Sequence, residues 1–248
     1  FSIGFEEDSY DESKYAREVA EYIGTNHYSE ILTANKSIEI IDKLKFIYDE
    51  PFSDSSQIPT IFLSSITSKH VKVALTGDGG DEIFGGYNRY LIAKNIFKYL
   101  KYLPFKVRNF VSKFLLMLTS SQWDKIANQL NFLIPSNLDF NQKGEKIVKF
   151  AEMLKSNSNI DMYMSLISNW QWASNLLKNH NDINLMNIKN DEISNMNFLS
   201  QMMSLDSTNY LTDDILVKVD RASMYSSLET RVPFLDKELV EFSNQLGE

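Results

Sequence analysis

The 248-residue sequence predicts an α/β protein: a parallel sheet with flanking helices, followed by a mainly helical region. Strand-like and helix-like segments alternate through residues 1–90, which is typical of a parallel sheet covered by helices. Strand signals then fade, and Leu, Phe and Met recur at helical spacing from Tyr90 to about Ser200. These two patterns together give the fold class.

Three strands are expected in the first part of the chain, because short runs of β-branched and aromatic residues stand between turn residues. The expected strands are Phe1–Phe5, Tyr28–Thr33 and Val71–Leu75. The third strand leads directly into a loop rich in glycine, which makes its carboxyl end the place to look for a ligand site.

Helices are expected between these strands. The first begins near Asp11, a typical N-cap, and ends at Gly24. Its apolar face would consist of Tyr15, Val19, Tyr22 and Ile23. A second amphipathic helix is expected through Ile38, Ile41, Leu44 and Tyr48. It would end just before Pro51, and Pro59 begins a third helix. In the helical region, breaks are expected at Pro104, Pro135 and Asn175–Asn197.

Composition excludes several classes of function. A net charge of −8 argues against bulk attraction to nucleic acid or anionic membranes. The chain has no cysteine, which excludes disulfides, thiolate metal sites and a cysteine nucleophile within these residues. Between Ile83 and Trp123 there are basic residues but no acidic ones, and we interpret this segment as a solvated helix face. A cytoplasmic protein with no nucleic-acid or membrane partner is expected.

The segment Thr76–Tyr87 carries the densest chemistry in the chain. It reads Thr-Gly-Asp-Gly-Gly-Asp-Glu-Ile-Phe-Gly-Gly-Tyr. Glycine allows a backbone to approach a ligand closely, and clustered backbone N–H groups bind phosphate or carboxylate oxygens. Clustered carboxylates suggest a cation such as Mg²⁺. The loop therefore predicts a nucleotide site.

Two further segments, together with this loop, carry a resemblance to a known family. They are Asp213–Met224, which reads Asp-Asp-Ile-Leu-Val-Lys-Val-Asp-Arg-Ala-Ser-Met, and Leu228–Asp236, which reads Leu-Glu-Thr-Arg-Val-Pro-Phe-Leu-Asp. In this order the three segments resemble the synthetase domain of the asparagine synthetase family, the ATP-pyrophosphatase class of amidotransferases. The resemblance implies an incomplete fold of the adenine nucleotide alpha hydrolase type. It also implies that residues 1–90 form the nucleotide-binding part, and that residues 91–248 form a mainly helical part of the same domain, which returns to the site at 213–236.

The resemblance implies a reaction as well. Such enzymes adenylate a carboxylate with ATP and Mg²⁺, and ammonia from a glutaminase domain then displaces AMP to leave an amide. Aspartate, giving asparagine, is the expected acceptor. A sugar uronic acid or another carboxylate is an alternative, and a non-catalytic nucleotide-binding or scaffold protein is a second alternative. A homodimer is left open.

The resemblance also assigns roles to residues. Asp81 matches the Mg²⁺ ligand, and Asp78 stands where many members carry a glutamate linked to acyl-adenylate formation. Arg221 or Lys218, one helical turn apart, would contact the reacting phosphate. The residues expected to contact ATP are Ile3, Thr76, Gly77, Gly79 and Gly80.

Other positions are open to two interpretations, as substrate contacts or as structural elements. Gly85, Gly86 and Tyr87 could form only a tight turn, and Glu229 with Arg231 could be an ion pair that holds a helix corner. Asp54 could belong to a capped turn around Pro51, and Glu82 adjoins the expected metal ligand.

The family's pyrophosphate-binding loop, Ser-Gly-Gly-x-Asp-Ser, does not occur in this sequence, nor does an N-terminal cysteine nucleophile. We therefore expect the chain to be a fragment of a longer amidotransferase, and to be inactive by itself.

Overall fold

The structure is a computed structural model that describes residues 1–100, 102–129, 143–156, 158–168 and 195–246. Within these ranges the chain forms two compact units. The first unit contains residues 1–84 and the C-terminal segment from Leu205, and the second contains residues 85–204. The expected break at Pro135, and most of the break at Asn175–Asn197, lie outside the described residues.

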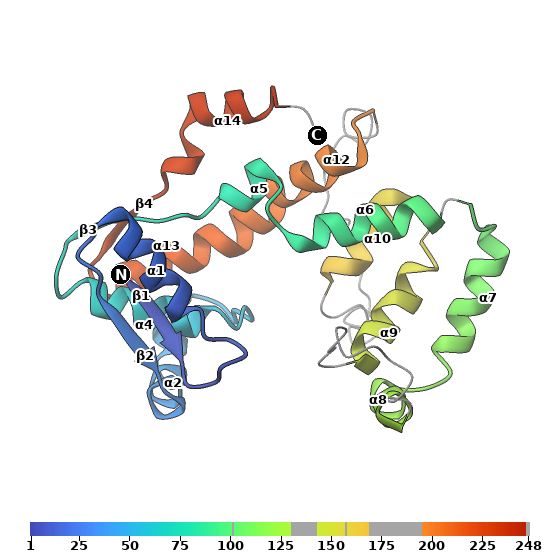
Figure 1. The fold of residues 1–248 in the computed structure, drawn as a ribbon, viewed down its shortest axis with the longest axis horizontal. Coiled ribbons are helices and arrows are strands. Elements are labelled where there is room, and N and C mark those ends of the chain that lie inside the picture. Colours follow the sequence, from blue (N-terminus) through green and yellow to red (C-terminus); the bar gives the residue numbers. More distant parts are fainter. Residues whose placement is uncertain (101, 130–142, 157, 169–194, 247–248) are drawn as a thin grey trace. The chain divides into compact units, whose positions relative to one another are not determined.

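The described strands all lie in the first unit and pair in parallel (Figure 1). Strand β1 (Ser2–Phe5) pairs with β2 (Ser29–Leu32), with Ser2 opposite Ser29. Strand β3 (Val73–Leu75) pairs with β4 (Glu229–Arg231), with Val73 opposite Glu229. The expected strands and their parallel pairing are confirmed, but they form two separate pairs rather than one sheet. Strand β4 was not expected, because Glu-Thr-Arg has no apolar alternation.

Helices account for most of the described residues in both units. In the first unit they are α1 (Ser13–Ile23), α2 (Ala34–Ile41), α3 (Leu44–Ile47), α4 (Gln57–Thr67), α5 (Gly80–Phe84), the π-helix η3 (Asp206–Ile215), α13 (Leu216–Tyr225), the 3₁₀-helix η4 (Pro233–Leu235) and α14 (Lys237–Ser243). In the second unit they are α6 (Asn88–Leu100), α7 (Phe105–Leu115), α8 (Ser120–Gln129), α9 (Lys143–Met153), α10 (Asn159–Ile167) and α12 (Phe198–Leu205). None of the described helices could cross a membrane.

Helix α1 ends where expected, but its N-cap is Glu12 rather than Asp11, and its burial also differs from the expected one. Asp11 Oδ1 accepts hydrogen bonds from the Ser13 and Phe5 backbone N–H groups, and Gly24 ends the helix in the left-handed region with φ 76°. The face formed by Tyr15, Val19, Tyr22 and Ile23 is exposed, with Tyr22 93% exposed. The periodicity therefore predicted the helix correctly but not its burial.

The helix expected through Ile38 and Tyr48 is wrong as a single element. The chain forms α2 and α3 instead, with a turn at Asp42 and Lys43 between them. Both Ile40 from α2 and Ile47 from α3 are buried in the same apolar cluster. The turn lets both short helices bury a residue in this cluster. Packing of apolar side chains contributes more to helix stability than an unbroken run of helical residues does.

The core of the first unit forms around α4. Its buried members are Leu32, Ile40, Ile47, Tyr48, Ile61, Phe62, Ile66 and Ala222. Ala222 comes from α13, a helix close to the C-terminus, and α13 packs on α4. This packing fixes α13 against the turn that precedes α4, where the candidate site lies.

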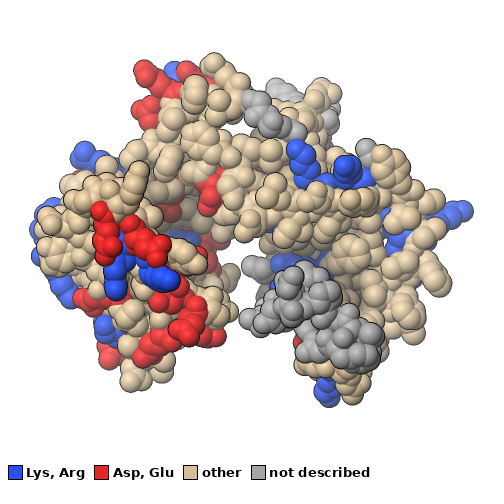
Figure 2. All heavy atoms as spheres, viewed as in Figure 1, with Lys and Arg blue, Asp and Glu red and all other residues tan. Residues whose placement is uncertain are grey.

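Charged side chains are unevenly distributed (Figure 2). On the face in view, Asp and Glu gather over the first unit, whereas the second unit shows mainly uncharged and basic residues. This matches the absence of acidic residues between Ile83 and Trp123.

Candidate active site

The Gly-rich loop begins where β3 ends, and its first residues pack against the third motif. The Thr76 N–H donates to the Arg231 carbonyl at 2.9 Å. Gly79 has φ 81°, and a Cβ there would lie 2.6 Å from Leu235 Cδ2. A side chain at Gly79 would therefore be strained by its positive φ and would have to displace the Leu235 side chain.

The remaining loop residues differ in exposure. Asp81 is exposed at the start of α5, Asp78 is half-buried, and Glu82 is buried with only 1% exposed. A Cβ at Gly77 would meet nothing within 4 Å, so this glycine faces open space. The Thr76 hydroxyl is buried without a hydrogen-bond partner among the described residues.

The end of the loop belongs to the second unit. Gly85 turns the chain with φ 67°. Tyr87 lies under the Arg89 guanidinium, 3.8 Å from the ring centroid to Cζ. These contacts give Gly85 and Tyr87 structural roles beside the predicted one.

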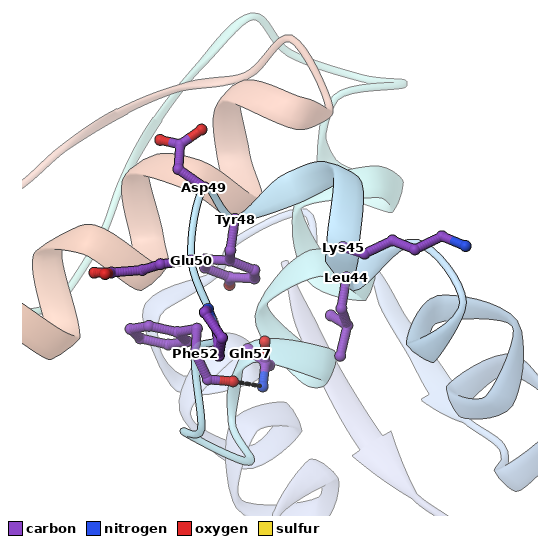
Figure 3. Close-up of a pocket in the computed structure, with 8 residues that line it drawn as sticks. Leu44, Lys45, Tyr48, Asp49, Glu50, Phe52 and Gln57 are labelled. Carbon is purple, nitrogen blue, oxygen red and sulfur yellow. Dashed lines mark hydrogen bonds between the residues drawn. The ribbon is translucent and has the colours of Figure 1, made fainter. Parts of the chain in front are cut away.

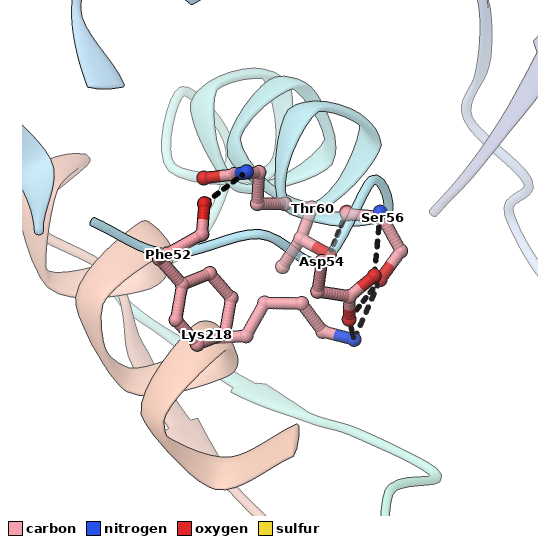
Figure 4. Close-up of polar contacts among 6 residues, drawn as sticks. Phe52, Asp54, Ser56, Thr60 and Lys218 are labelled. Carbon is pink, nitrogen blue, oxygen red and sulfur yellow. Dashed lines mark hydrogen bonds and ion pairs between the residues drawn. The ribbon is translucent and has the colours of Figure 1, made fainter. Parts of the chain in front are cut away.

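Lys218 on α13 is held by the turn before α4 (Figure 4). Its Nζ lies 2.6 Å from Asp54 Oδ2 and 2.6 Å from Ser56 Oγ, and the residue is only 7% exposed. Asp54 also accepts from the Ser56 N–H at 2.8 Å and the Ser56 hydroxyl at 2.7 Å. The Lys218 ammonium is thus already engaged by protein oxygens.

Arg221, one turn further along α13, has different surroundings. Its Nη2 lies 2.8 Å from Asp49 Oδ2, and the side chains are 47% and 77% exposed. An ion pair this exposed contributes roughly 0–1 kcal/mol to stability, because water and salt screen it. The Arg221 guanidinium can therefore exchange Asp49 for another anion at little cost.

A pocket of about 430 Å³ adjoins this ion pair (Figure 3). Tyr48 and Phe52 stack in one wall, with ring centroids 4.7 Å apart and planes 3° apart. Asp49 and Glu50 line it as well, and Gln57 Nε2 donates to the Phe52 carbonyl at 3.0 Å. The pocket combines an aromatic wall with charged and amide groups, which suits a small polar ligand.

Two carboxyl groups near Lys218 have shifted pKa values in opposite directions. Burial raises the pKa of Asp54, but hydrogen bonds from Lys218 and Ser56 outweigh it and leave the pKa below its usual value. Burial, followed by the Asp54 charge, raises the pKa of Asp214 to about 6, although Lys218 opposes the shift. Burial, with the charges of both carboxylates, raises the pKa of Tyr48 to about 12.

Tyr48 and Asp214 were not expected at the site. Asp214 lies inside the second motif, so its sequence position was a signal, but nothing in the sequence shows that it faces Asp54. Tyr48 reads as an ordinary apolar position of a helix.

The third motif combines pairing and capping. Arg231 Nε lies 2.8 Å from Glu229 Oε1 in an exposed ion pair. Asp236 caps α14 by accepting from the Glu238 and Leu239 N–H groups. Ser223 of α13 lies 3.3 Å from the Thr230 hydroxyl, which links the second motif to β4. Of the expected site residues, Ile3 lies apart from these contacts, in β1 opposite Glu30.

Comparison with known proteins places this architecture in a family. The asparagine synthase family model matches residues 1–247, and the chain belongs to that family. It is 28% identical over 247 residues to a putative glutamine-hydrolyzing asparagine synthetase of Mycobacterium tuberculosis strain H37Rv, covering 99% of this chain and 35% of that protein. Asparagine synthetase 1 of Bacillus subtilis is 27% identical over 253 residues, covering 99% of this chain and 36% of that protein.

A second kind of match is shorter but has a higher identity. A putative asparagine synthetase of Methanocaldococcus jannaschii is 48% identical over 91 residues, which cover 37% of this chain and 18% of that protein. The matches to the Mycobacterium tuberculosis and Bacillus subtilis proteins cover nearly all of this chain, which spans about a third of the length of those relatives. No solved structure matches it significantly.

Proposed function

We propose that this chain carries the nucleotide and acceptor sites of an ATP-dependent, amide-forming enzyme. The enzyme would adenylate a carboxylate, in the first instance aspartate, for attack by ammonia derived from glutamine. The observation that carries the proposal is the assembly in one unit of the first nine residues of the Gly-rich loop, 76–84, with the second and third motifs. Strand β3 and the Gly-rich loop contact residues 229–235, and α13 contacts β4.

The two cations of α13 receive separate roles. A carboxylate that attacks an α-phosphate is an anion approaching an anion, so a cation is needed beside the reacting phosphate. Arg221 is exposed and weakly paired, and its planar fork can bind phosphate oxygens in pairs. Lys218 is buried in contact with Asp54 and Ser56. We assign the phosphate contact to Arg221 and a positioning role to Lys218.

Magnesium fits the loop as a nucleotide-bound ion. No group of three or more carboxylates or histidines suited to a metal occurs among the described residues. Mg²⁺ commonly uses one or two carboxylates together with substrate phosphates, and Asp81 is an exposed carboxylate on this loop. When bound, the ion would neutralise charge on the departing pyrophosphate. Asp81 would hold it, and Asp78 would lie beside the reacting carboxylate.

The pocket beside Asp49 is the proposed place for the acceptor. It adjoins the Arg221 ion pair, so an acceptor carboxylate there would lie near the proposed phosphate contact. The loop Asp49–Thr60 supplies most of its lining, and this segment sets the shape that an acceptor must fit.

The test is product analysis with the full-length protein. ATP, Mg²⁺ and ammonia are supplied with aspartate in one arm and a uronic acid in the other. Amide with equal AMP and pyrophosphate in the aspartate arm supports the proposal. Product only in the uronic acid arm transfers the chemistry to a sugar acceptor, and no AMP in either arm refutes it. If the protein is non-catalytic, the substitutions Asp81→Asn and Arg221→Ala should leave its function intact.

A further inference from the structure

The cluster around Lys218 contains one more carboxylate than it has cations. Asp54 holds the ammonium at 2.6 Å, and Asp214 lies within hydrogen-bonding reach of Asp54. Asp214 Oδ1 and the Tyr48 hydroxyl are both buried with no hydrogen-bond partner among the described residues. With both carboxyl groups ionised, the cluster carries a net charge of −1.

Such a cluster lowers stability. Two carboxylates in a partly buried site repel each other, and unpaired buried polar atoms lose their hydration without compensation. An amide group in place of Asp214 would remove the repulsion between the two carboxylates. Costly arrangements of this kind concentrate at functional sites, and strongly shifted carboxyl groups do as well.

The position of Asp214 supports the same reading. It stands near the end of the ten-residue π-helix η3, which runs directly into α13. π-Helical turns are rare, and they occur frequently at functional sites. Asp214 precedes Lys218 by four residues, so it acts on the helix that carries both Lys218 and Arg221.

We propose that Asp214 is a positioning residue of the amide-forming reaction. Ionised Asp214 adds a second negative charge beside the Lys218 ammonium and, through it, fixes α13 so that Arg221 is presented to the reacting phosphate. This inference rests on the proposed function. It assigns to Asp214 a role that acts through Lys218, with no contact to substrate.

The groups that surround Asp214 come from three directions. Asp54 approaches from the turn before α4, Lys218 from α13, and Tyr48 from the end of α3. Helix α5, which also packs on η3, carries Asp81 and Glu82, but the shift at Asp214 arises from burial, Asp54 and Lys218. Loss of a proton from Asp214 is therefore the charge change expected near pH 6.

The experiment compares Asp214→Asn with Asp213→Asn in the full-length protein. Asp213 is the exposed neighbour, and it accepts only a local hydrogen bond from Thr212 at 3.1 Å. Amide formation from aspartate, ammonia and ATP is measured from pH 5 to 8.5, with kcat and KM for ATP at each pH. Thermal unfolding of each variant is recorded at pH 7.5.

Wild-type kcat is expected to rise through about pH 6 as Asp214 loses its proton. Asparagine mimics the protonated form, so Asp214→Asn should lack this rise and have a kcat roughly ten- to a hundredfold lower at pH 7.5. Its KM for ATP should change less than about threefold. Its unfolding temperature should not fall, and Asp213→Asn should behave as wild type.

Three outcomes oppose these expectations. If Asp214→Asn keeps wild-type kcat and the rise near pH 6, the inference is wrong while the proposed function stands. If its loss of activity accompanies a lower unfolding temperature, Asp214 is structural and the inference is again wrong. If the wild-type protein forms no amide at any pH, the proposed function itself fails.

Discussion

Lys218 and Arg221 stand one turn apart on the same helix, yet their surroundings differ completely. Lys218 is buried against Asp54 and Ser56, whereas the Arg221–Asp49 pair is open to solvent. A sequence shows both cations at helical spacing but not which one the protein has already neutralised. The structure supplies that distinction, because Asp54 is 164 residues away in the chain.

The Lys218–Asp54 pair should contribute measurably to stability. Asp54→Asn removes the carboxylate that contacts the buried Lys218 ammonium and leaves Asp214 as the nearby negative charge. Loss of this charged hydrogen bond is expected to cost about 1–3 kcal/mol. Urea unfolding of the 248-residue chain measures the change. The matched control is Glu241→Gln, which removes the exposed Lys237–Glu241 pair and should cost less than about 0.5 kcal/mol. Equal effects of the two substitutions would contradict the burial of Lys218.

Asp214 should make stability depend on pH in the opposite sense to most carboxylates. Burial and the Asp54 charge raise its pKa in the folded chain to about 6, above the ordinary value for an aspartate. Proton binding by Asp214 therefore stabilises the folded chain fully below about pH 4, and this stabilisation is lost as pH rises through 6. Asp214→Asn should therefore gain stability relative to wild type between pH 4 and 7.5. Thermal unfolding across this range checks the sign, and a constant difference would contradict it.

At the scale of single elements, the Gly-rich loop contains glycines of two kinds: Gly79 is required by the local structure, whereas Gly77 faces open space. Gly79→Ala must adopt φ 81° and place a Cβ 2.6 Å from Leu235, so it should destabilise the chain by about 1–3 kcal/mol. Gly77→Ala meets open space and should change stability by less than about 0.5 kcal/mol. Urea unfolding distinguishes the two.

The same pair of substitutions tests the role of the loop. A methyl group at Gly77 projects where a nucleotide would approach, so Gly77→Ala should weaken ATP binding by the full-length protein in spite of its normal stability. Calorimetric titration with ATP measures this. Unchanged affinity would place the nucleotide away from Gly77.

The elements that could be predicted are those determined by local sequence. Gly24 determines the end of α1 and Asp236 determines the start of α14, because caps act within a few residues. Asp11 predicts the start of α1 to within one residue, since the N-cap is Glu12. The break between α2 and α3 could not be predicted, since it depends on a cluster that includes Ala222. Strand β4 has the same origin, because its hydrogen bonds come from β3, more than 150 residues earlier.

For the candidate site, the motifs predicted which residues belong to it but not which side chains contact each other. Lys218, Arg221 and Asp54 could each be named from sequence, whereas the pairing of Lys218 with Asp54 could not. Asp214 lies inside the second motif and Tyr48 occupies an apolar helix position, and neither pattern assigns them to the surroundings of Asp54. Their importance depends on burial near Asp54, which only the folded chain shows.

At the scale of the whole molecule, most of the three motifs lies in the unit formed by the two ends of the chain. Residues 76–84 of the Gly-rich loop, α13 and the segment from Glu229 to Asp236 belong to that unit, and residues 85–87 and the helices α6 to α10 belong to the other. This arrangement is the physical basis for treating distant sequence motifs as one site.

The most direct test of the account is the stoichiometry of AMP and asparagine formed by the full-length protein from ATP, aspartate and ammonia. We expect one AMP per asparagine in the wild type. Both products should fall by at least about a hundredfold in Arg221→Ala, because a charge-stabilising contact to the transition state is lost. ADP in place of AMP, or an Arg221→Ala variant with wild-type rates, would contradict it.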